Sequence, residues 1–449
     1  ADRPLADSAA ASEVVRQLDG LPLAIELAAA KLRSVSVTDL ATGLRERLAL
    51  LEDGPRDAPT RHRTLQMAIR WSYDLLTPAE QGVLRLLSVF PGSFEASAAE
   101  AVAGKESLAI LARLVDASLV AADPPRFRLL VTVRTFGRER LVEHGEERQA
   151  RQRHRDAFVA LAESVGRNMC NAGLGPWLVR GQLEQENFLA ALRWSLDRGD
   201  AGPAFALAAW LTLFWFRTGF VRDGMALLEE AMAGADPCDP HWPRALVGRA
   251  CLTCASGLDA LGATEDAVVA AERAGEDDLL ALALGWRGYE LLRRRQLSEA
   301  RAHLVRAQAL AMGTHDDEAI AFSDQMLGEL AMAEGDLDAA ANLLVRARDR
   351  YRRSRVTVDA GFTLVDLARV RLAQSRFSDA LTIAGEALAD FRHREDPRGV
   401  ASALRCLSQA YAGLGQPDRA RRTLAEACAL VERWGFALHL SGQLDDQVG

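Results

Sequence analysis

Gln296-Leu297-Ser298-Glu299-Ala300 is the first of four similar segments in the second half of the chain. The other three are Asp336-Leu337-Asp338-Ala339-Ala340, Arg376-Phe377-Ser378-Asp379-Ala380 and Gln416-Pro417-Asp418-Arg419-Ala420. Their final alanines lie 40 residues apart, and a second alanine follows each of them seven residues later, at Ala307, Ala347, Ala387 and Ala427. A small residue precedes each segment's last alanine by 12 positions, at Gly288, Gly328, Ala368 and Ser408. Because small residues allow two helices to cross closely, this spacing predicts a repeated helix–turn–helix unit.

The turns of these units contain Gly335 and Gly415, which we expect in the left-handed conformation that ends a helix. Weaker copies near residues 262–267 and 219–224 place the start of the array near residue 151, with six or seven helix pairs. The arrangement resembles the tetratricopeptide (TPR) repeat, whose usual period is about 34 residues. The longer period here predicts longer helices, and therefore a TPR-like α-solenoid over residues 151–449.

Residues 60–150 have a different pattern. An amphipathic helix is predicted for residues 64–76, and Thr77-Pro78-Ala79-Glu80 is a strong start for a second helix that continues to Phe90. Two short helices are expected at residues 96–102 and 107–117. A hairpin follows, with Leu119-Val120-Ala121 and Phe127-Arg128-Leu129-Leu130 on either side of Asp123-Pro124-Pro125. Helices followed by a short hairpin are typical of a winged-helix module.

Residues 1–59 are predicted to form a helical lid. Helices are expected at residues 9–18, 23–32 and 37–51, with Gly20-Leu21-Pro22 interrupting the first two. The fold class predicted for the whole chain is therefore mainly α: a helical lid at 1–59, a winged-helix module at 60–150, and the TPR-like array at 151–449.

The first 150 residues resemble the signalling ATPases known as STAND proteins. Gly20-Leu21-Pro22-Leu23-Ala24-Ile25-Glu26-Leu27-Ala28-Ala29 is similar to their GxP motif. Their winged helix is matched by Arg63-Thr64-Leu65, Trp71-Ser72-Tyr73-Asp74-Leu75-Leu76, Leu87-Ser88-Val89-Phe90-Pro91-Gly92, Leu114-Val115-Asp116-Ala117-Ser118-Leu119-Val120 and Phe127-Arg128-Leu129-Leu130-Val131-Thr132-Val133-Arg134. With a TPR array behind these segments, the chain is most similar to the AfsR/SARP-type and LuxR-type bacterial transcription regulators.

This resemblance implies a nucleotide switch in which an NTPase core precedes the GxP helix. ATP or ADP is then expected in the intact parent protein, and Gly20 and Pro22 are the implied cofactor-binding residues, with Pro22 packing on the adenine. A protein or small-molecule signal on the array would open the closed form of this switch. Nucleotide exchange and oligomerisation would follow. The chain starts at Ala1 and opens like the middle of a helical domain, so we expect an upstream part. The alternative is a stand-alone TPR interaction scaffold without a nucleotide switch.

The sequence departs from that family in two places. It contains no G-x-x-x-x-G-K-[ST] phosphate loop, since Glu106 follows Gly104-Lys105. Without amides and a lysine to hold phosphates, the chain is not expected to hydrolyse nucleotide, and no catalytic residue set stands out. Leu130 and Val131 occupy the positions where related proteins have a nucleotide-sensing His-Asp pair, and neither side chain can hydrogen-bond a phosphate.

Composition limits the partners. The net charge is −8, so bulk charge does not favour nucleic-acid binding. Arginines near the hairpin could contact phosphates, but glutamates lie close by and the helix at 107–117 is mainly apolar, which favours a structural joint over direct DNA contact. No apolar run reaches the roughly 18–20 residues that span a bilayer. We therefore expect no membrane contact and a cytoplasmic location.

Three further patterns allow two interpretations each. Cys251-x-x-Cys254 could suggest zinc, but its place in the repeat favours two buried core cysteines and no metal site. Trp210, Phe214, Trp215 and Phe216 either line a ligand pocket or pack one helix into the array. Arg293-Arg294-Arg295 and Arg352-Arg353 favour solvated helix ends, with a phosphate or acidic-partner site as the alternative.

Overall fold

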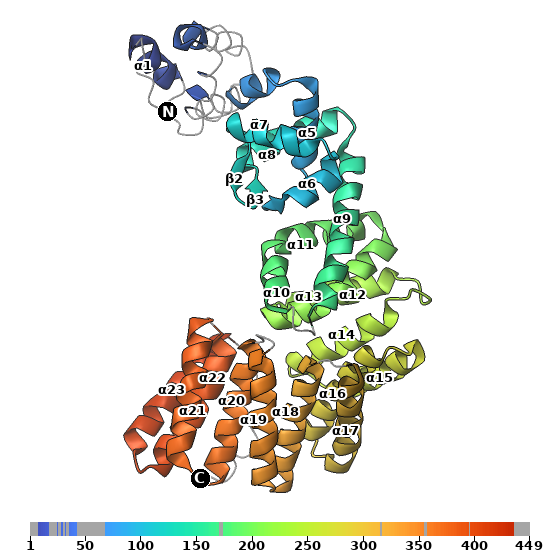
Figure 1. Ribbon diagram of the computed structural model, residues 1–449, viewed down its shortest axis with the longest axis vertical. Helices are drawn as coiled ribbons and strands as arrows, with labels where there is room; N and C mark the ends of the chain where they lie inside the picture. Colours follow the sequence, from blue (N-terminus) through green and yellow to red (C-terminus); the bar gives the residue numbers. More distant parts are fainter. Residues whose placement is uncertain are drawn as a thin grey trace. The chain divides into compact units, whose positions relative to one another are not determined.

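The computed structural model describes residues 8–17, 25, 28, 29, 32, 36–42, 68–169, 174–314, 317–353, 357–394 and 396–434. The chain divides into two compact units (Figure 1). Unit 1 comprises residues 1–160 and 183–195, and unit 2 comprises residues 161–182 and 196–449. Gly20 and Pro22 lie outside the described residues, as does most of the predicted lid. The three-domain division therefore stays a prediction.

Unit 1 contains short helices and a small sheet. Residues 68–74 are helical, and the other elements are α1 (Ser8–Gln17), α5 (Pro78–Leu87), β1 (Phe94–Glu95), α6 (Ala96–Ala103), α7 (Ser107–Asp116), β2 (Ala121–Asp123), β3 (Arg126–Arg128) and α8 (Val131–Glu143). Helix α5 starts at the predicted capping box, in which the Thr77 amide donates to Glu80 Oε2 at 2.8 Å and the Glu80 amide donates to Thr77 Oγ1 at 3.4 Å. Helices α5, α6 and α7 followed by the hairpin are the order expected for a winged helix. Helix α5 is shorter than predicted, since it ends at Leu87 before Phe90.

The sheet has three antiparallel strands in the order β1-β3-β2. Phe127 of β3 pairs with Phe94 on one side and with Ala122 on the other. Strand β1 was not predicted, because two residues are too short to show an alternating pattern. Its Phe94 is fully buried and stacks on Phe90 with ring centroids 4.3 Å apart.

Helices α9 (Glu147–Arg167), α10 (Leu174–Leu183) and α11 (Gln185–Arg198) contribute residues to both units. The remaining helices belong to unit 2. They are α12 (Ala201–Thr218), α13 (Val221–Gly234), α14 (Trp242–Ala255), α15 (Leu261–Ala274), α16 (Asp277–Arg293), α17 (Leu297–Thr314), α18 (Asp317–Glu334), α19 (Leu337–Arg353), α20 (Thr357–Ala373), α21 (Phe377–His393), α22 (Pro397–Gly413) and α23 (Pro417–Trp434).

Each helix of unit 2 from α14 onwards packs on the next, and each first helix of a pair also packs on the first helix of the following pair (Figure 1). This is the TPR-like solenoid predicted from the repeat. The predicted crossings are close: a Cβ added at Gly288 would lie 2.4 Å from Leu304 Cδ2, and one at Gly328 would lie 2.8 Å from Leu344 Cγ. Ala300, Ala340 and Ala380 are fully buried in the second helices.

The turns repeat one backbone conformation. Gly335 and Gly415 have positive φ, as predicted, with values of 90° and 71°. The equivalent positions in the other two units hold Arg295 and Ser375, whose φ values are 61° and 58°. The same left-handed residue therefore ends the first helix in all four units, with or without glycine.

Ion pairs link neighbouring second helices on the outside of the array. Arg306 of α17 contacts Glu272 of α15 at 2.6 Å, and Arg392 of α21 contacts Glu426 of α23 at 2.7 Å. Both pairs are exposed and screened by water, so each adds at most about 1 kcal/mol to stability. No helix among the described residues is long and apolar enough to cross a membrane.

Candidate ligand-binding site

A cavity of about 560 Å³ lies on the inner face of the array in unit 2. Apart from Arg295 and Leu337, every lining residue comes from the first helix of a pair: α12, α14, α16, α18, α20 or α22. Ligand pockets of small-molecule size commonly enclose about 300–1,000 Å³. The cavity is therefore large enough for a small organic molecule or a short peptide segment.

The repeat positions determine which side chains reach the cavity. Tyr289, Glu329, Arg369 and Gln409 each follow the small crossing residue directly, and all four line the cavity. Two positions before the crossing residue stand Trp286, Met326, Asp366 and Cys406, which also line it. The crossing residues face the second helix, and these neighbours face inward. The sequence prediction missed these residues, although their constant place beside the crossing residue is a signal that the 40-residue repeat contains.

One side of the cavity is aromatic. Trp286 of α16 contacts Phe216 of α12, with ring centroids 5.3 Å apart, and Phe322 of α18, with centroids 5.1 Å apart. Tyr289 lies one helical turn further, at 5.6 Å from Trp286. Among the described residues, no acceptor lies within hydrogen-bonding distance of the buried indole nitrogen of Trp286. This wall can hold an apolar ring, and it has a spare donor for a polar atom.

The floor of the cavity is a buried polar cluster from α18 and α20. Arg369 contacts Glu329 at 3.4 Å and Asp366 at 3.3 Å. Gln325 donates from Nε2 to the other carboxylate oxygen of Asp366 at 2.7 Å. Both carboxylates thus have partners within the protein, as buried charges require.

Burial controls the protonation of this cluster. It raises the pKa of Glu329 to about 8; the charge of nearby Asp366 adds to the rise, and Arg369 opposes it. For Arg369, burial alone would lower the pKa, but the two carboxylates hold the pKa above its usual value. Burial therefore favours the protonated form of Glu329 and the two carboxylates favour the charged form of Arg369.

The opposite side of the cavity is formed by α22. Arg398, Ser402, Arg405 and Gln409 are spaced four, three and four residues apart, so they share one helix face, and all four line the cavity. Each of these side chains can donate a hydrogen bond. The guanidinium of Arg398 also lies over the Phe362 ring, 5.4 Å from its centroid.

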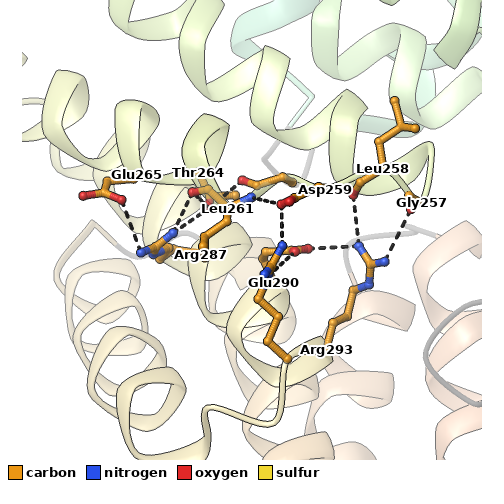
Figure 2. A network of polar contacts seen from close by, with 11 residues as sticks. Gly257, Leu258, Asp259, Leu261, Thr264, Glu265, Arg287, Glu290 and Arg293 are labelled. Carbon is orange, nitrogen blue, oxygen red and sulfur yellow. Dashed lines mark hydrogen bonds and ion pairs between the residues drawn. The ribbon is translucent and has the colours of Figure 1, made fainter. Parts of the chain in front are cut away.

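The rim near Arg293 is fixed by the polar network in Figure 2. Arg293 donates to the buried carboxylate of Glu290 at 2.9 Å and to the carbonyl oxygens of Leu258 and Gly257 at 3.3 and 3.4 Å. Arg287 donates to the carbonyl of Leu261 at 2.7 Å. These contacts hold the turn between α14 and α15 against α16, so Arg293 is structurally engaged and its charge is compensated by Glu290.

The structure places the residues singled out from the sequence in different environments. Phe214 and Trp215 are fully buried, which confirms packing for them, whereas Phe216 of the same run lines the cavity. Cys251 and Cys254 are fully buried in α14, as the core interpretation predicted. The described residues contain no group of three His, Cys, Asp or Glu side chains placed to hold a metal ion. Arg295 lines the cavity.

Arg126, one of the arginines near the hairpin that could have contacted phosphates, is not available for such contacts. Its guanidinium is buried and donates to Glu184 at 2.7 Å and to the Ser93 hydroxyl at 2.8 Å. Sequence reasoning missed this, because Glu184 lies 58 positions away in the chain. The arginine ties β3 to the segment before α11 within unit 1.

No protein-family model matches the chain. A Mycobacterium tuberculosis protein named as a candidate HTH-type transcriptional regulator is 40% identical over 230 residues. That match covers 49% of this chain and 26% of the relative, so the chain spans about a quarter of the length of this curated relative. Half of the chain is thus similar in sequence to part of a protein named as a transcription regulator.

Solved structures show weaker likenesses. A STAND protein with a tetratricopeptide repeat sensor from Pyrococcus horikoshii has a TM-score of 0.41 at 14% identity, covering 92% of this chain and 72% of that one. A Rap protein complexed with competence and sporulation factor has a TM-score of 0.45 at 10% identity, covering 62% of this chain and 92% of that one. The solenoid described above follows from the chain's own helices and does not depend on these likenesses.

Proposed function

We propose that this chain is the signal-sensing part of a transcription regulator, and that the array binds a protein or small-molecule signal on its inner face. The observation that carries the proposal is the cavity, which joins an aromatic wall, a buried polar floor and a wall of hydrogen-bond donors. Solenoids commonly use their inner surface for binding. The similarity over half the chain to a protein named as a candidate HTH-type transcriptional regulator supports the regulatory part of the proposal.

The finer mechanism is a two-state switch. Signal binding to the array favours one arrangement of the regulator over another, because a ligand shifts an equilibrium only by its different affinity for the two states. We propose that the switch is an upstream NTPase core that binds ATP or ADP, with Gly20 and Pro22 at the edge of its nucleotide site. This step is supported by the motif resemblance of the first 150 residues.

A cavity-filling variant tests the sensing role. Ala333 is exposed on α18 and lines the cavity, so Ala333→Trp fills the site without disturbing the core. Ala302→Trp, on the exposed face of α17, is the matched control. Transcript levels are measured across the genome in strains carrying each variant in the full-length protein, beside a strain lacking the gene.

A change in transcripts with Ala333→Trp, and none with Ala302→Trp, is the expected result. If Ala333→Trp and deletion both leave every transcript unchanged, the regulator role is rejected and an interaction scaffold becomes the better explanation. The switch is tested separately by ADP release from the full-length protein. An unaltered release rate in an Ala333→Trp protein that still changes transcription would reject the nucleotide switch and keep the sensor.

A further inference from the structure

The cavity wall formed by α12, α16 and α18 is rich in aromatic rings. Phe216 and Phe322 are only partly buried, and both contact the buried ring of Trp286. Met326 and Met332 of α18 also line the cavity. Aromatic rings make favourable edge-to-face and offset contacts with other rings, and thioether sulfurs make favourable contacts with ring edges. This wall therefore suits an aromatic ring better than a saturated one.

The charged side chains near this wall already have partners of opposite charge. Arg369 contacts both Glu329 and Asp366, at 3.4 and 3.3 Å. Arg293 is paired with the buried carboxylate of Glu290 at 2.9 Å. Both guanidinium groups are thus compensated within the protein, and neither needs an anion from a ligand.

The side chains of α22 are engaged as well. Arg398 donates to the carbonyl oxygen of Ala255 at 3.3 Å and lies over the Phe362 ring. The Ser402 hydroxyl donates to the carbonyl oxygen of Arg398 at 3.0 Å, and Arg405 also interacts within the protein. An uncharged ligand leaves all of these contacts in place, whereas a charged one would have to compete with them.

A charge of either sign on the ligand is therefore unfavourable. A carboxylate would lose its water without gaining a free guanidinium inside the cavity, and Arg295 is exposed to water, where an ion pair gains little. An ammonium group would meet a lining with five arginines, while the two lining acids, Glu329 and Asp366, are already held by Arg369. Burial also favours the uncharged form of Glu329, which weakens its attraction for a cation.

We infer that the array binds an uncharged aromatic small molecule, with its ring against Phe216, Trp286 and Phe322. This inference rests on the proposed sensing role of the cavity and names the class of signal. A cavity of about 560 Å³ has room for a fused aromatic ring system. Binding is driven by the burial of apolar surface and by ring contacts, and the polar contacts of the floor and of α22 stay intact.

The test compares probes that share a ring and differ in charge. 2-Naphthol, 2-naphthoate and 2-naphthylmethylammonium are titrated into the full chain by calorimetry at pH 7, together with decahydro-2-naphthol, the saturated counterpart of 2-naphthol. 2-Naphthol is expected to bind at least about tenfold more tightly than either ion, because a buried ion without a partner is costly. It should bind about threefold more tightly than its saturated counterpart, because only the flat ring makes the aromatic contacts.

Variants locate the contact. Phe322→Leu is expected to weaken 2-naphthol about threefold or more and to remove its advantage over the saturated probe. Phe216→Leu, on α12, should act in the same direction. Phe377→Leu is the matched control, since Phe377 is also partly buried but lies on α21 and does not line the cavity.

Ala333→Trp, which fills the cavity, should abolish binding of 2-naphthol, and Ala302→Trp should leave binding unchanged. Circular dichroism of each variant checks that the array is folded.

Several outcomes would overturn the inference. Either ion binding as tightly as 2-naphthol would show that the lining charges are not compensated. Equal binding of the saturated probe would reject the aromatic class, and unaltered binding in Ala333→Trp would place the probe outside the cavity. No binding of 2-naphthol at about 1 mM, the weak end of measurable affinity, would reject the ligand class as a whole.

These results are independent of the transcription experiment. Binding of 2-naphthol in the cavity without any transcript change in the Ala333→Trp strain would keep this ligand class and reject the sensing role. A transcript change in that strain without binding of 2-naphthol would keep the sensing role and reject this ligand class.

Discussion

The guanidinium of Arg398 donates a hydrogen bond to the carbonyl oxygen of Ala255 at 3.3 Å, although 143 residues separate the two in the chain. Arg398 lies in the first turn of α22, and Ala255 is the last residue of α14. The carbonyl groups at a helix C-terminus carry partial negative charge, which suits a cation. The contact links the last of the cavity-forming helices to one of the first, so it is placed to hold the curvature of the array.

Removing that link is expected to loosen the array. Arg398→Gln should lower the free energy of unfolding of unit 2 by about 1.5–3 kcal/mol, the usual contribution of a hydrogen bond that involves a charged group. Amide hydrogen exchange should also become faster in the peptide that ends α14. Arg392→Gln, which breaks an exposed outer pair with Glu426, is the control and should cost no more than about 1 kcal/mol. Equal effects in the two variants would contradict a special role for Arg398.

The crossing glycines give a second prediction. Gly288→Ala is expected to destabilise unit 2 by about 1–3 kcal/mol, because the new Cβ would lie 2.4 Å from Leu304 Cδ2 and 2.5 Å from its Cγ in a fully buried site. Gly385→Ala is the matched control within a helix, since nothing lies within 4 Å of its Cβ position. That control should stabilise the protein by about 0.5–1 kcal/mol through helix propensity alone. Thermal unfolding of the two variants compares them, and destabilisation by both would show that crowding is not the cause.

The crossings were predictable because they depend on contacts inside one helix pair. The small residues that make those contacts repeat every 40 positions in the sequence. The left-handed turns were predictable at Gly335 and Gly415 for the same local reason, but Arg295 and Ser375 adopt the same conformation without a glycine to mark it. The cavity was harder to predict. Glu329, Asp366 and Arg369 become a cluster only because successive first helices lie side by side, and Arg398 reaches Ala255 only because the array curves. Neither property is visible in a single repeat.

The floor of the cavity makes the stability of unit 2 sensitive to alkaline pH. Burial raises the pKa of Glu329 to about 8, so between about pH 4.5 and 8 the folded protein retains a proton that the unfolded chain loses. The folded state therefore loses relative stability as pH rises from about 4.5 to 8, and the loss is complete above 8. Glu329→Gln removes this titration. The fall in Tm between pH 5.5 and pH 8.5 should therefore be a few degrees smaller in the variant than in the parent protein. If Tm falls equally between the two pH values in the variant and the parent, Glu329 is not the cause of the alkaline sensitivity.

Arg126 is expected to be essential for the folding of unit 1. It is buried with Glu184, and the same carboxylate accepts from Asn187 Nδ2 at 2.7 Å. Arg126→Ala would leave Glu184 buried without its cation, which typically costs about 3–5 kcal/mol. Limited proteolysis should then cleave unit 1 faster at residues 90–130. Arg128→Ala, on the exposed end of the same strand, is the control and should leave the cleavage rate unchanged. Equal cleavage rates in the two variants would show that the buried Arg126–Glu184 pair contributes little to the stability of unit 1.

His154 should make unit 1 respond to pH in the opposite direction to Glu329. It is buried between Phe90 and Phe158, with ring centroids 5.1 and 4.5 Å away. Burial lowers its pKa to about 4, although a contact with Asn187 opposes the shift. Between about pH 6.5 and 4 the unfolded chain binds a proton that the folded state excludes, so unit 1 loses stability as pH falls through this window and keeps it above 6.5.

His154→Phe should reduce this acid sensitivity, because an aromatic ring of similar shape keeps the packing and cannot titrate. Chemical unfolding of unit 1 is followed at pH 7 and pH 4.5 in the parent protein, in His154→Phe and in the exposed control His144→Gln. The parent and the control should lose stability on acidification, and His154→Phe should lose clearly less. The same loss in all three would assign the acid response to other groups. Since Glu329 destabilises unit 2 as pH rises, the two titrations can be separated by direction as well as by unit.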